Sequence, residues 1–145
     1  MTAAIFVDTN VLLYALDHAD QRKQTAARLW RDALWKSRLG RISFQVLEEF
    51  YVQVMKKWPN AREAARGEIR DLLTWQPVEI RGEILERAWR LQDRFQLSFW
   101  DALIVAAAQS SSCRYLLTED LQHDQEIDGL RIVSPFACEP DSLLS

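Results

Sequence analysis

Asp101 is the residue of this sequence whose surroundings most require a chemical explanation. Residues 98–108 have the sequence SFWDALIVAAA, which predicts a helix that is apolar on every side, as in a helix packed inside a protein. An ionised carboxylate in such a setting is strongly destabilising unless another group compensates its charge. The segment itself contains no Lys or Arg. We therefore expect Asp101 to meet a cation, a metal ion or other acids from elsewhere in the chain.

Two other acids follow segments that are predicted to be strands. Residues 4–7 form a short apolar run that ends at Asp8, and residues 115–118 form a second run that Asp120 closely follows. Ligand sites of parallel sheets lie just outside the carboxyl ends of the strands. Asp8 and Asp120 are therefore predicted at this edge, and Asp101, in the first turn of its helix, could reach the same place.

A fourth acid is available in the helix predicted at residues 45–57. Glu48 and Glu49 are adjacent there, and neither lies within the apolar stripe of the helix, so periodicity does not choose between them. Clustered carboxylates repel one another in the absence of a cation. Oxygen ligands with open positions suit Mg²⁺ or Mn²⁺ rather than zinc, so these positions predict a divalent-metal site.

Each acid also has a purely structural interpretation. Asp8 could cap the helix that follows it, because Asp is a favoured N-cap residue. Ser98 and Asp101 have the spacing of a capping box, and Asp120 could be an ordinary turn residue. A cap does not exclude a role in a site, because an acid in the first turn of a helix can also face a ligand.

Predicted strands alternate with predicted helices along the whole chain. The strands are expected at 4–7, 41–44, 77–80, 115–118 and 130–133, and the helices at 10–16, 21–37, 45–57, 61–75, 82–95 and 98–108. This order predicts an α/β fold, a three-layer α/β/α domain with a mainly parallel central sheet. The length of 145 residues predicts a single domain over residues 1–145.

The six tryptophans are mostly predicted to be packing residues. Trp30 and Trp89 fit amphipathic core stripes, and Trp100 lies on the helix that is expected to be buried. Exposed tryptophans can stack on nucleic-acid bases, but packing is the better interpretation for these three. Trp58 and Trp75 fit neither interpretation clearly.

Charge and cysteine usage narrow the setting of the protein. Residues 20–70 carry 12 Lys or Arg and 6 Asp or Glu, whereas residues 71–145 carry 6 and 13, for a net charge of −3 over the chain. This distribution suits a protein that binds a polyanion with its basic part and cations with its acidic part. Charged residues on solvated helix faces would give the same pattern. Cys113 and Cys138 lack the spacing of a zinc site or a disulfide framework, so a reducing cytoplasm fits best.

Membrane insertion and export are not expected. The N-terminus has no basic region before its apolar run, which Asp8 interrupts early, so a signal peptide is not predicted. The longest apolar run, residues 102–108, is too short to span a membrane. We therefore expect a cytoplasmic protein.

Four segments of the sequence resemble motifs of PIN-domain ribonucleases, in particular VapC-type toxins of bacterial toxin–antitoxin pairs. In the family's order they are FVDTNVLLYA (6–15), ISFQVLEEF (42–50), LSFWDALI (97–104) and LTEDLQH (117–123). They extend over nearly the whole domain. The resemblance implies a PIN-like fold and an endonuclease that cleaves RNA, with a small antitoxin that covers the acidic groove and a homodimeric assembly.

The resemblance also implies an acidic quartet and three polar residues that orient the acids and water. The quartet is Asp8, Glu49, Asp101 and Asp120, and the orienting residues are Thr9, Asn10 and Thr118. Glu49 is selected over Glu48 because the family's acid directly precedes an aromatic residue, here Phe50.

The sequence departs from the family pattern at two places. Asp124 stands where relatives often have glycine, and it is interpreted as a solvated loop residue rather than a fifth ligand. Ser134 precedes Pro135 and Phe136 where relatives often have Asn, so a contact that braces the backbone near the last strand is in question.

A mechanism follows for the expected Mg²⁺ or Mn²⁺ site. The ion would lower the pKa of a bound water and orient it in line with a phosphodiester. Asp8 and Asp101 are expected to contact the ion directly, and Asp120 directly or through water. Glu49 is expected to position or deprotonate the attacking water. The basic segment 56–70 is the best candidate for an arm that faces RNA or a partner protein.

Three other functions are also considered for this sequence. A metal-free ribonuclease would use His18 and His123 as acid and base. A phosphatase would use Asp8 as nucleophile, but that chemistry usually has a second acid where Asn10 stands. A non-toxin or catalytically silent PIN-fold domain would bind RNA or regulate a partner without cleaving.

Overall fold

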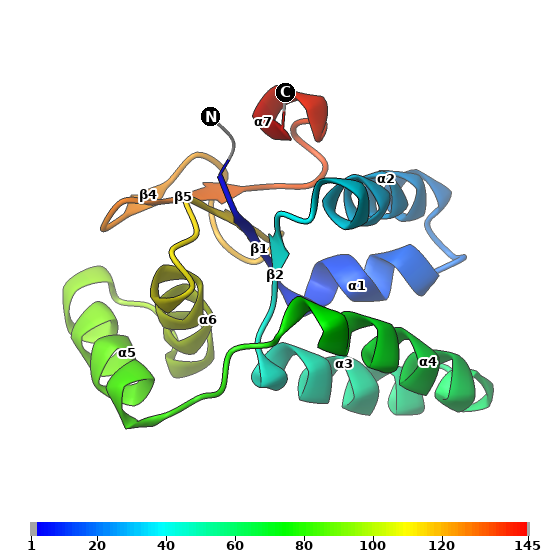
Figure 1. Ribbon diagram of the computed structural model, residues 1–145, viewed down its shortest axis with the longest axis horizontal. Helices are drawn as coiled ribbons and strands as arrows, with labels where there is room; N and C mark the ends of the chain where they lie inside the picture. The colour runs from blue at the N-terminus through cyan, green and yellow to red at the C-terminus, as the bar shows by residue number, and fades with distance from the viewer. Residues whose placement is uncertain (1–2, 145) are drawn as a thin grey trace.

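A mainly parallel sheet forms the centre of the protein (Figure 1), which we describe from a computed structural model over residues 3–144. Within these residues the sheet has five strands, in the order β2-β1-β3-β5-β4. Their bounds are β1 (Ile5–Val7), β2 (Gly40–Arg41), β3 (Tyr115–Leu117), β4 (Glu126–Ile127) and β5 (Leu130–Val133). All neighbouring pairs are parallel except β4 and β5, which are antiparallel.

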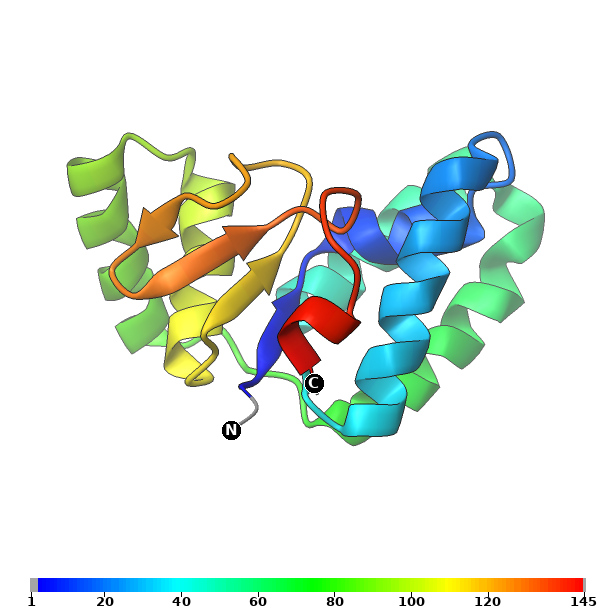
Figure 2. The same ribbon diagram turned by 90° about the horizontal axis from the view of Figure 1, so that it is seen from above.

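Helices pack on both faces of this sheet. They are α1 (Thr9–Leu16), α2 (Gln21–Ser37), α3 (Phe44–Lys57), α4 (Arg62–Leu72), α5 (Gly82–Phe95), α6 (Phe99–Ser110) and α7 (Asp141–Leu144), with short 3₁₀ turns at Pro59–Ala61 and Leu73–Trp75. Figure 2 shows α2 and α7 on the near side of the strands and α5 and α6 on the far side. The predicted three-layer α/β fold is therefore confirmed.

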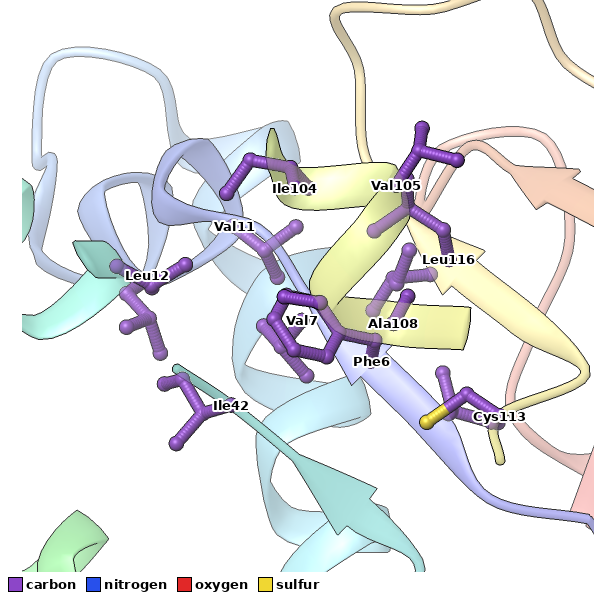
Figure 3. Packing of buried hydrophobic residues seen from close by; sticks show 14 of the residues in the cluster. Phe6, Val7, Val11, Leu12, Ile42, Ile104, Val105, Ala108, Cys113 and Leu116 are labelled. Atoms are coloured by element: carbon purple, nitrogen blue, oxygen red, sulfur yellow. The ribbon is translucent and has the colours of Figure 1, made fainter. Parts of the chain in front are cut away.

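The strands of the sheet are buried because both of their faces are covered. Ile5, Phe6 and Val7 are almost completely buried, which explains the continuous apolar run of β1. Figure 3 shows Phe6 and Val7 of β1 among apolar side chains that include Val11 of α1 and Ala108 of α6. Packing of this kind fixes β1, and therefore the residue that follows it, against the helices on both sides.

Local sequence signals set the starts of three helices beside the carboxyl edge of the sheet. Asp8 caps α1, Ser43 caps α3 and Ser98 caps α6, each accepting a hydrogen bond from a backbone N–H of its helix. The positive end of each helix dipole therefore lies toward this edge, where it favours negative charge. Trp58 and Pro59 end α3.

Several predicted boundaries were wrong for identifiable reasons. The strand expected at 41–44 is shorter, because Ser43 caps α3 and Phe44 already belongs to the helix. The strand expected at 77–80 is reduced to a single bridge between Val78 and Ser43. The helix expected at 61–75 ends at Leu72 and continues as a 3₁₀ turn. Strand β4 and helix α7 were not predicted.

The tryptophan predictions were partly wrong as well. Trp30 is buried, as expected, but Trp89 is 48% exposed and Trp100 is 62% exposed. The buried residues of α5 are Ile84, Ala88 and Leu91, so Trp89 lies just outside that stripe. Trp100 lies in the first turn of α6, whereas the buried part of that helix begins at Ala102.

Trp75 has a packing role that the sequence did not reveal. Its ring lies against Gly40 so closely that a Cβ atom at residue 40 would be 2.4 Å from the ring. On its other side it meets Trp35, with ring centroids 5.2 Å apart. Gly40 is thus required by the close approach of an aromatic ring.

Among residues 3–144, no helix is both long and apolar enough to cross a membrane.

Candidate active site at the carboxyl edge of the sheet

Asp8 is buried at the point where β1 ends and α1 begins. Its Oδ1 accepts a hydrogen bond from the backbone N–H of Thr9 at 2.7 Å, so the predicted capping role is real. Its Oδ2 accepts hydrogen bonds from Thr118 Oγ1 at 2.8 Å and from Asn10 Nδ2 at 3.3 Å. The cap and the site contacts use different oxygens of the same carboxylate.

Thr118 connects Asp8 to the neighbouring strand. It directly follows β3, and the N–H of Asp8 donates to the carbonyl of Leu117 at 3.0 Å, so the two strand ends lie side by side. The Thr118 hydroxyl also accepts from Asn10 Nδ2 at 3.1 Å and from the N–H of Asp120 at 3.0 Å. Thr118 therefore fixes the start of the loop that carries Asp120, whose side chain is exposed.

Glu49 is held at both of its carboxylate oxygens. Oε2 accepts from Thr9 Oγ1 and Oε1 accepts from Gln45 Nε2, each at 3.0 Å. Glu48 is exposed, whereas Glu49 is partly buried. The structure thus brings Glu49, and not its neighbour, to α1 and the acids beside it.

Gln45 was not singled out by the sequence. It is 93% buried in the first turn of α3, where it orients Glu49, and its own Oε1 has no hydrogen-bond partner among the described residues. A buried amide usually has hydrogen-bond partners for both its oxygen and its nitrogen. Here Nε2 donates to Glu49 while Oε1 has no partner among the described residues, so the bond to Glu49 sets the orientation of the amide. One weak signal was available, since Gln45 and Glu49 are four residues apart on one helix.

Asp101 occupies the first turn of α6. Its backbone N–H donates to Ser98 Oγ at 3.1 Å, so the capping interpretation is also correct in part. The side chain is partly buried. Burial raises the pKa of Asp101 above its ordinary value, a hydrogen bond between the Ser98 side chain and the Asp101 carboxylate opposes this, and the charges of Asp120 and Glu49 raise it further.

Electrostatic repulsion acts between these acids. Burial raises the pKa of Asp8 from 3.8 to about 6; hydrogen bonds with Thr118 and Thr9 oppose the change, while the charges of Asp120 and Glu49 add to it. Asp120 and Glu49 thus act on both Asp8 and Asp101. Negative charge is concentrated at this edge, so a cation would relieve the repulsion between the acids.

The donor set fits a hard divalent ion by its chemistry. Carboxylate oxygens predominate, and the hydrogen-bond network of these acids contains no cysteine or histidine. In the side-chain arrangement of residues 3–144, however, no three acids, histidines or cysteines lie close enough together to hold one ion. Asp8 is held by its hydrogen bonds to protein donors, so bringing three acids onto one ion would require other carboxylates to move.

The two departures from the family pattern lie outside this network. Asp124 is exposed and has a φ of 68°, a left-handed conformation that explains why glycine suits this position. Ser134 Oγ accepts from the N–H of Phe136 at 3.2 Å, so a serine still braces the backbone here.

The histidines do not form a pair. His123 Nδ1 accepts from the N–H of Ser134 at 3.0 Å, and its Nε2 is 3.5 Å from Asp124. His18 Nδ1 lies 3.3 Å from Gln24 Nε2, at the start of α2. Neither ring takes part in the contacts of the acids, which gives no support to a metal-free acid–base pair.

The protein thus has an α/β fold. Its candidate site, at the carboxyl edge of the sheet, consists of carboxylates and the hydroxyl and amide groups that orient them. The sequence matches the family model of the PIN domain over residues 5–125, so the chain belongs to the PIN domain family. A comparison with curated proteins gave no match.

Solved structures share the fold at low sequence identity. A chain of a toxin–antitoxin complex from Klebsiella pneumoniae has a TM-score of 0.62 and 24% identity, covering 92% of this chain and 98% of its own. A chain of DNA-bound VapBC from Salmonella typhimurium has a TM-score of 0.65 and 15% identity, with coverage of 93% and 99%. VapC20 of Mycobacterium tuberculosis, a toxin that cleaves the sarcin–ricin loop, has a TM-score of 0.61 and 22% identity, with coverage of 78% and 87%.

Proposed function

We propose that this protein is a divalent-metal-dependent endoribonuclease and the toxin of a toxin–antitoxin pair. The observation that carries the proposal is the network at the sheet edge, in which Thr118 Oγ1 and Thr9 Oγ1 hold Asp8 and Glu49 respectively. Membership of the PIN domain family and the likeness to toxin structures support it. An acidic cluster of this kind is suited to cations rather than directly to a polyanion.

Within this proposal, Asp8 and Asp101 would hold Mg²⁺ directly, with Mn²⁺ as a substitute, and Asp120 would hold it directly or through water. A divalent ion bound there would acidify a water and offset the negative charge that develops on the phosphate oxygens. The remaining work falls to the protein's own groups.

Glu49 would orient the attacking water and accept its proton. Thr9 and Gln45 fix both oxygens of this carboxylate, so little reorganisation is needed before the proton moves. Asn10 and Thr118 would keep Asp8 and the loop of Asp120 in place, because they join the ends of β1 and β3. These are roles of binding and positioning, which suit cleavage of a phosphodiester by water.

The partners are proposed on the same basis. The Klebsiella and Salmonella proteins are parts of toxin–antitoxin assemblies, so we infer that a small antitoxin covers the acidic edge of this chain. RNA is the proposed substrate, and a homodimer and a cytoplasmic location are part of the proposal.

The test is cleavage of total RNA by purified protein with Mg²⁺, with EDTA and with Asp101→Asn. Cleavage is expected only for the native protein with metal. An Asp93→Asn variant is the matched control, because Asp93 is an exposed aspartate on α5. Cleavage that persists in EDTA or in folded Asp101→Asn would contradict the proposal, and a native protein that binds RNA but never cleaves it would favour a silent PIN-fold domain.

A further inference from the structure

A small cavity adjoins the acids between α1, the end of α3 and the loop after β3. Its volume is about 210 Å³, and Asn10 and Asp120 of the candidate site form part of its wall. The rest of the wall includes Tyr14, Lys57 and Trp58. Pockets for drug-sized ligands measure roughly 300–1,000 Å³, so this one suits a single ring system.

Trp58 and Lys57 give this cavity an aromatic wall and a cation. Helix α3 ends at Lys57 because Trp58 leaves the helical conformation and Pro59 follows. The Trp58 side chain is partly buried, and Lys57 Nζ lies 5.9 Å from the centroid of its ring. Within residues 3–144, Lys57 has no ion pair, whereas Glu119, which also lines the cavity, is already paired with Lys23.

The segment that passes the cavity at Lys57 and Trp58 carries an excess of positive charge, whereas the cavity wall itself also contains Asp17, Glu119 and Asp120. Residues 56–70 contain five Lys or Arg and two Glu. Both glutamates are paired, Glu63 with Arg66 and Glu68 with Arg31 of α2. In the described part of the chain, the other four basic residues of the segment take part in no ion pair; they are Lys56, Lys57, Arg62 and Arg70. The negatively charged backbone of an RNA would therefore be attracted to this segment, whose member on the cavity wall is Lys57.

We propose that the cavity is a nucleotide subsite, in which one base of single-stranded RNA stacks on Trp58 while a neighbouring phosphate contacts Lys57. The inference rests on the proposed ribonuclease function and deepens it. A base offers a flat π-face to an indole whatever its sequence, and a lysine offers a point charge to a phosphate. Because Asn10 and Asp120 belong both to the cavity wall and to the candidate site, a nucleotide bound in the cavity would lie next to the phosphodiester bond that is cut.

The experiment measures the dissociation constant of a short single-stranded RNA by fluorescence anisotropy in EDTA, where cleavage is not expected. Trp58→Leu and Lys57→Gln are compared with the native protein. Lys56→Gln is the matched control for charge, because Lys56 is adjacent and exposed but does not line the cavity. Trp89→Leu is the control for loss of an exposed indole elsewhere.

Loss of a base–aromatic stack is expected to weaken binding about fivefold or more in Trp58→Leu. Lys57→Gln is expected to weaken it by a larger factor than Lys56→Gln, and Trp89→Leu is expected to have no effect. If Trp58→Leu does not fold, Trp58→Phe and an RNA that lacks bases, bound to native protein, test the same contact. Equal effects of Lys57→Gln and Lys56→Gln would overturn the subsite. So would native protein that binds the RNA without bases as tightly as the normal RNA.

Cleavage assays separate this inference from the proposed function. If the native protein cleaves RNA and the Trp58 and Lys57 variants bind and cleave as well as it does, only the subsite is wrong. If the native protein cleaves no RNA with Mg²⁺, the proposed function is wrong. If RNA binding is unchanged in both variants while an arginine-rich peptide binds the native protein and not the variants, the cavity accepts a protein instead, which also overturns the subsite.

Discussion

The hydroxyl of Thr9 donates a hydrogen bond of 3.0 Å to Oε2 of Glu49, across 40 residues of sequence. Thr9 begins α1 and Glu49 lies in the second turn of α3, so this contact joins two helices at the edge where β1 ends. Gln45 completes the clamp from within α3. The orientation of Glu49 therefore depends on side chains from both helices.

The choice between the adjacent glutamates gives the first prediction. Glu49→Gln is expected to lower kcat for RNA cleavage by about 10²–10⁴-fold, the usual effect of losing a general base. Glu48→Gln is expected to retain native activity, because Glu48 is exposed to solvent. Single-turnover cleavage rates measure both variants. Loss of activity in Glu48→Gln alone would show that the wrong glutamate has been placed in the site.

Gln45 is expected to act through Glu49. Gln45→Leu removes one of the two donors that hold the carboxylate, so kcat should fall by roughly 10–100-fold, as for other groups that orient a ligand or base. Gln53→Leu, a change of the same type farther along α3, is the control. A native kcat in Gln45→Leu would leave Gln45 with a packing role alone.

Asp8 should make the metal-free protein less stable as pH rises. The folded protein raises the pKa of this carboxyl from 3.8 to about 6, so the folded state binds the proton more tightly than the unfolded state. Stability is therefore highest below the unfolded value and is lost between about pH 4 and pH 6, by roughly 3 kcal/mol. Denaturant titrations across this range in EDTA measure the effect. Asp8→Asn should remove this contribution, and an unchanged pH dependence in that variant would assign it to other groups.

Gly40 provides a prediction about stability alone. Gly40→Ala would place a methyl group against the Trp75 ring, where its Cβ would be only 2.4 Å away. Overpacking of this kind costs about 1–3 kcal/mol. Because β2 lies at the edge of the sheet beyond β1, the cleavage rate per folded molecule should not change. The same substitution in a Trp75→Leu background should cost less, and equal costs in both backgrounds would contradict the contact.

The parts of this fold that sequence could predict are those that local patterns determine. The apolar run of β1 and the aspartate that ends it are adjacent in sequence, and so are Ser98 and the helix that carries Asp101. The same holds for Gly82–Phe95, whose bounds follow from its apolar stripe. Patterns of this length need no knowledge of the rest of the chain.

The remaining features depend on contacts that are distant in sequence. Periodicity could not distinguish Glu48 from Glu49, because Thr9 of another helix makes the difference. Trp100 was expected in the core since its helix is apolar, but its side chain is 62% exposed in the first turn of α6. Strand β4 pairs with β5 over only two residues, which leaves too short a pattern to detect.

The measurement that tests the central claim most directly is the melting temperature of the native protein and of Asp8→Asn and Asp101→Asn with millimolar Mn²⁺ and with EDTA. An ion that binds only the folded protein stabilises it, by about 2.7 kcal/mol when its concentration is 100 times the dissociation constant. We expect Mn²⁺ to raise the melting temperature of the native protein, and EDTA to reverse the rise, with little or no rise in either variant. A native protein that Mn²⁺ does not stabilise, or variants that it stabilises equally, would mean that these acids do not share a divalent ion.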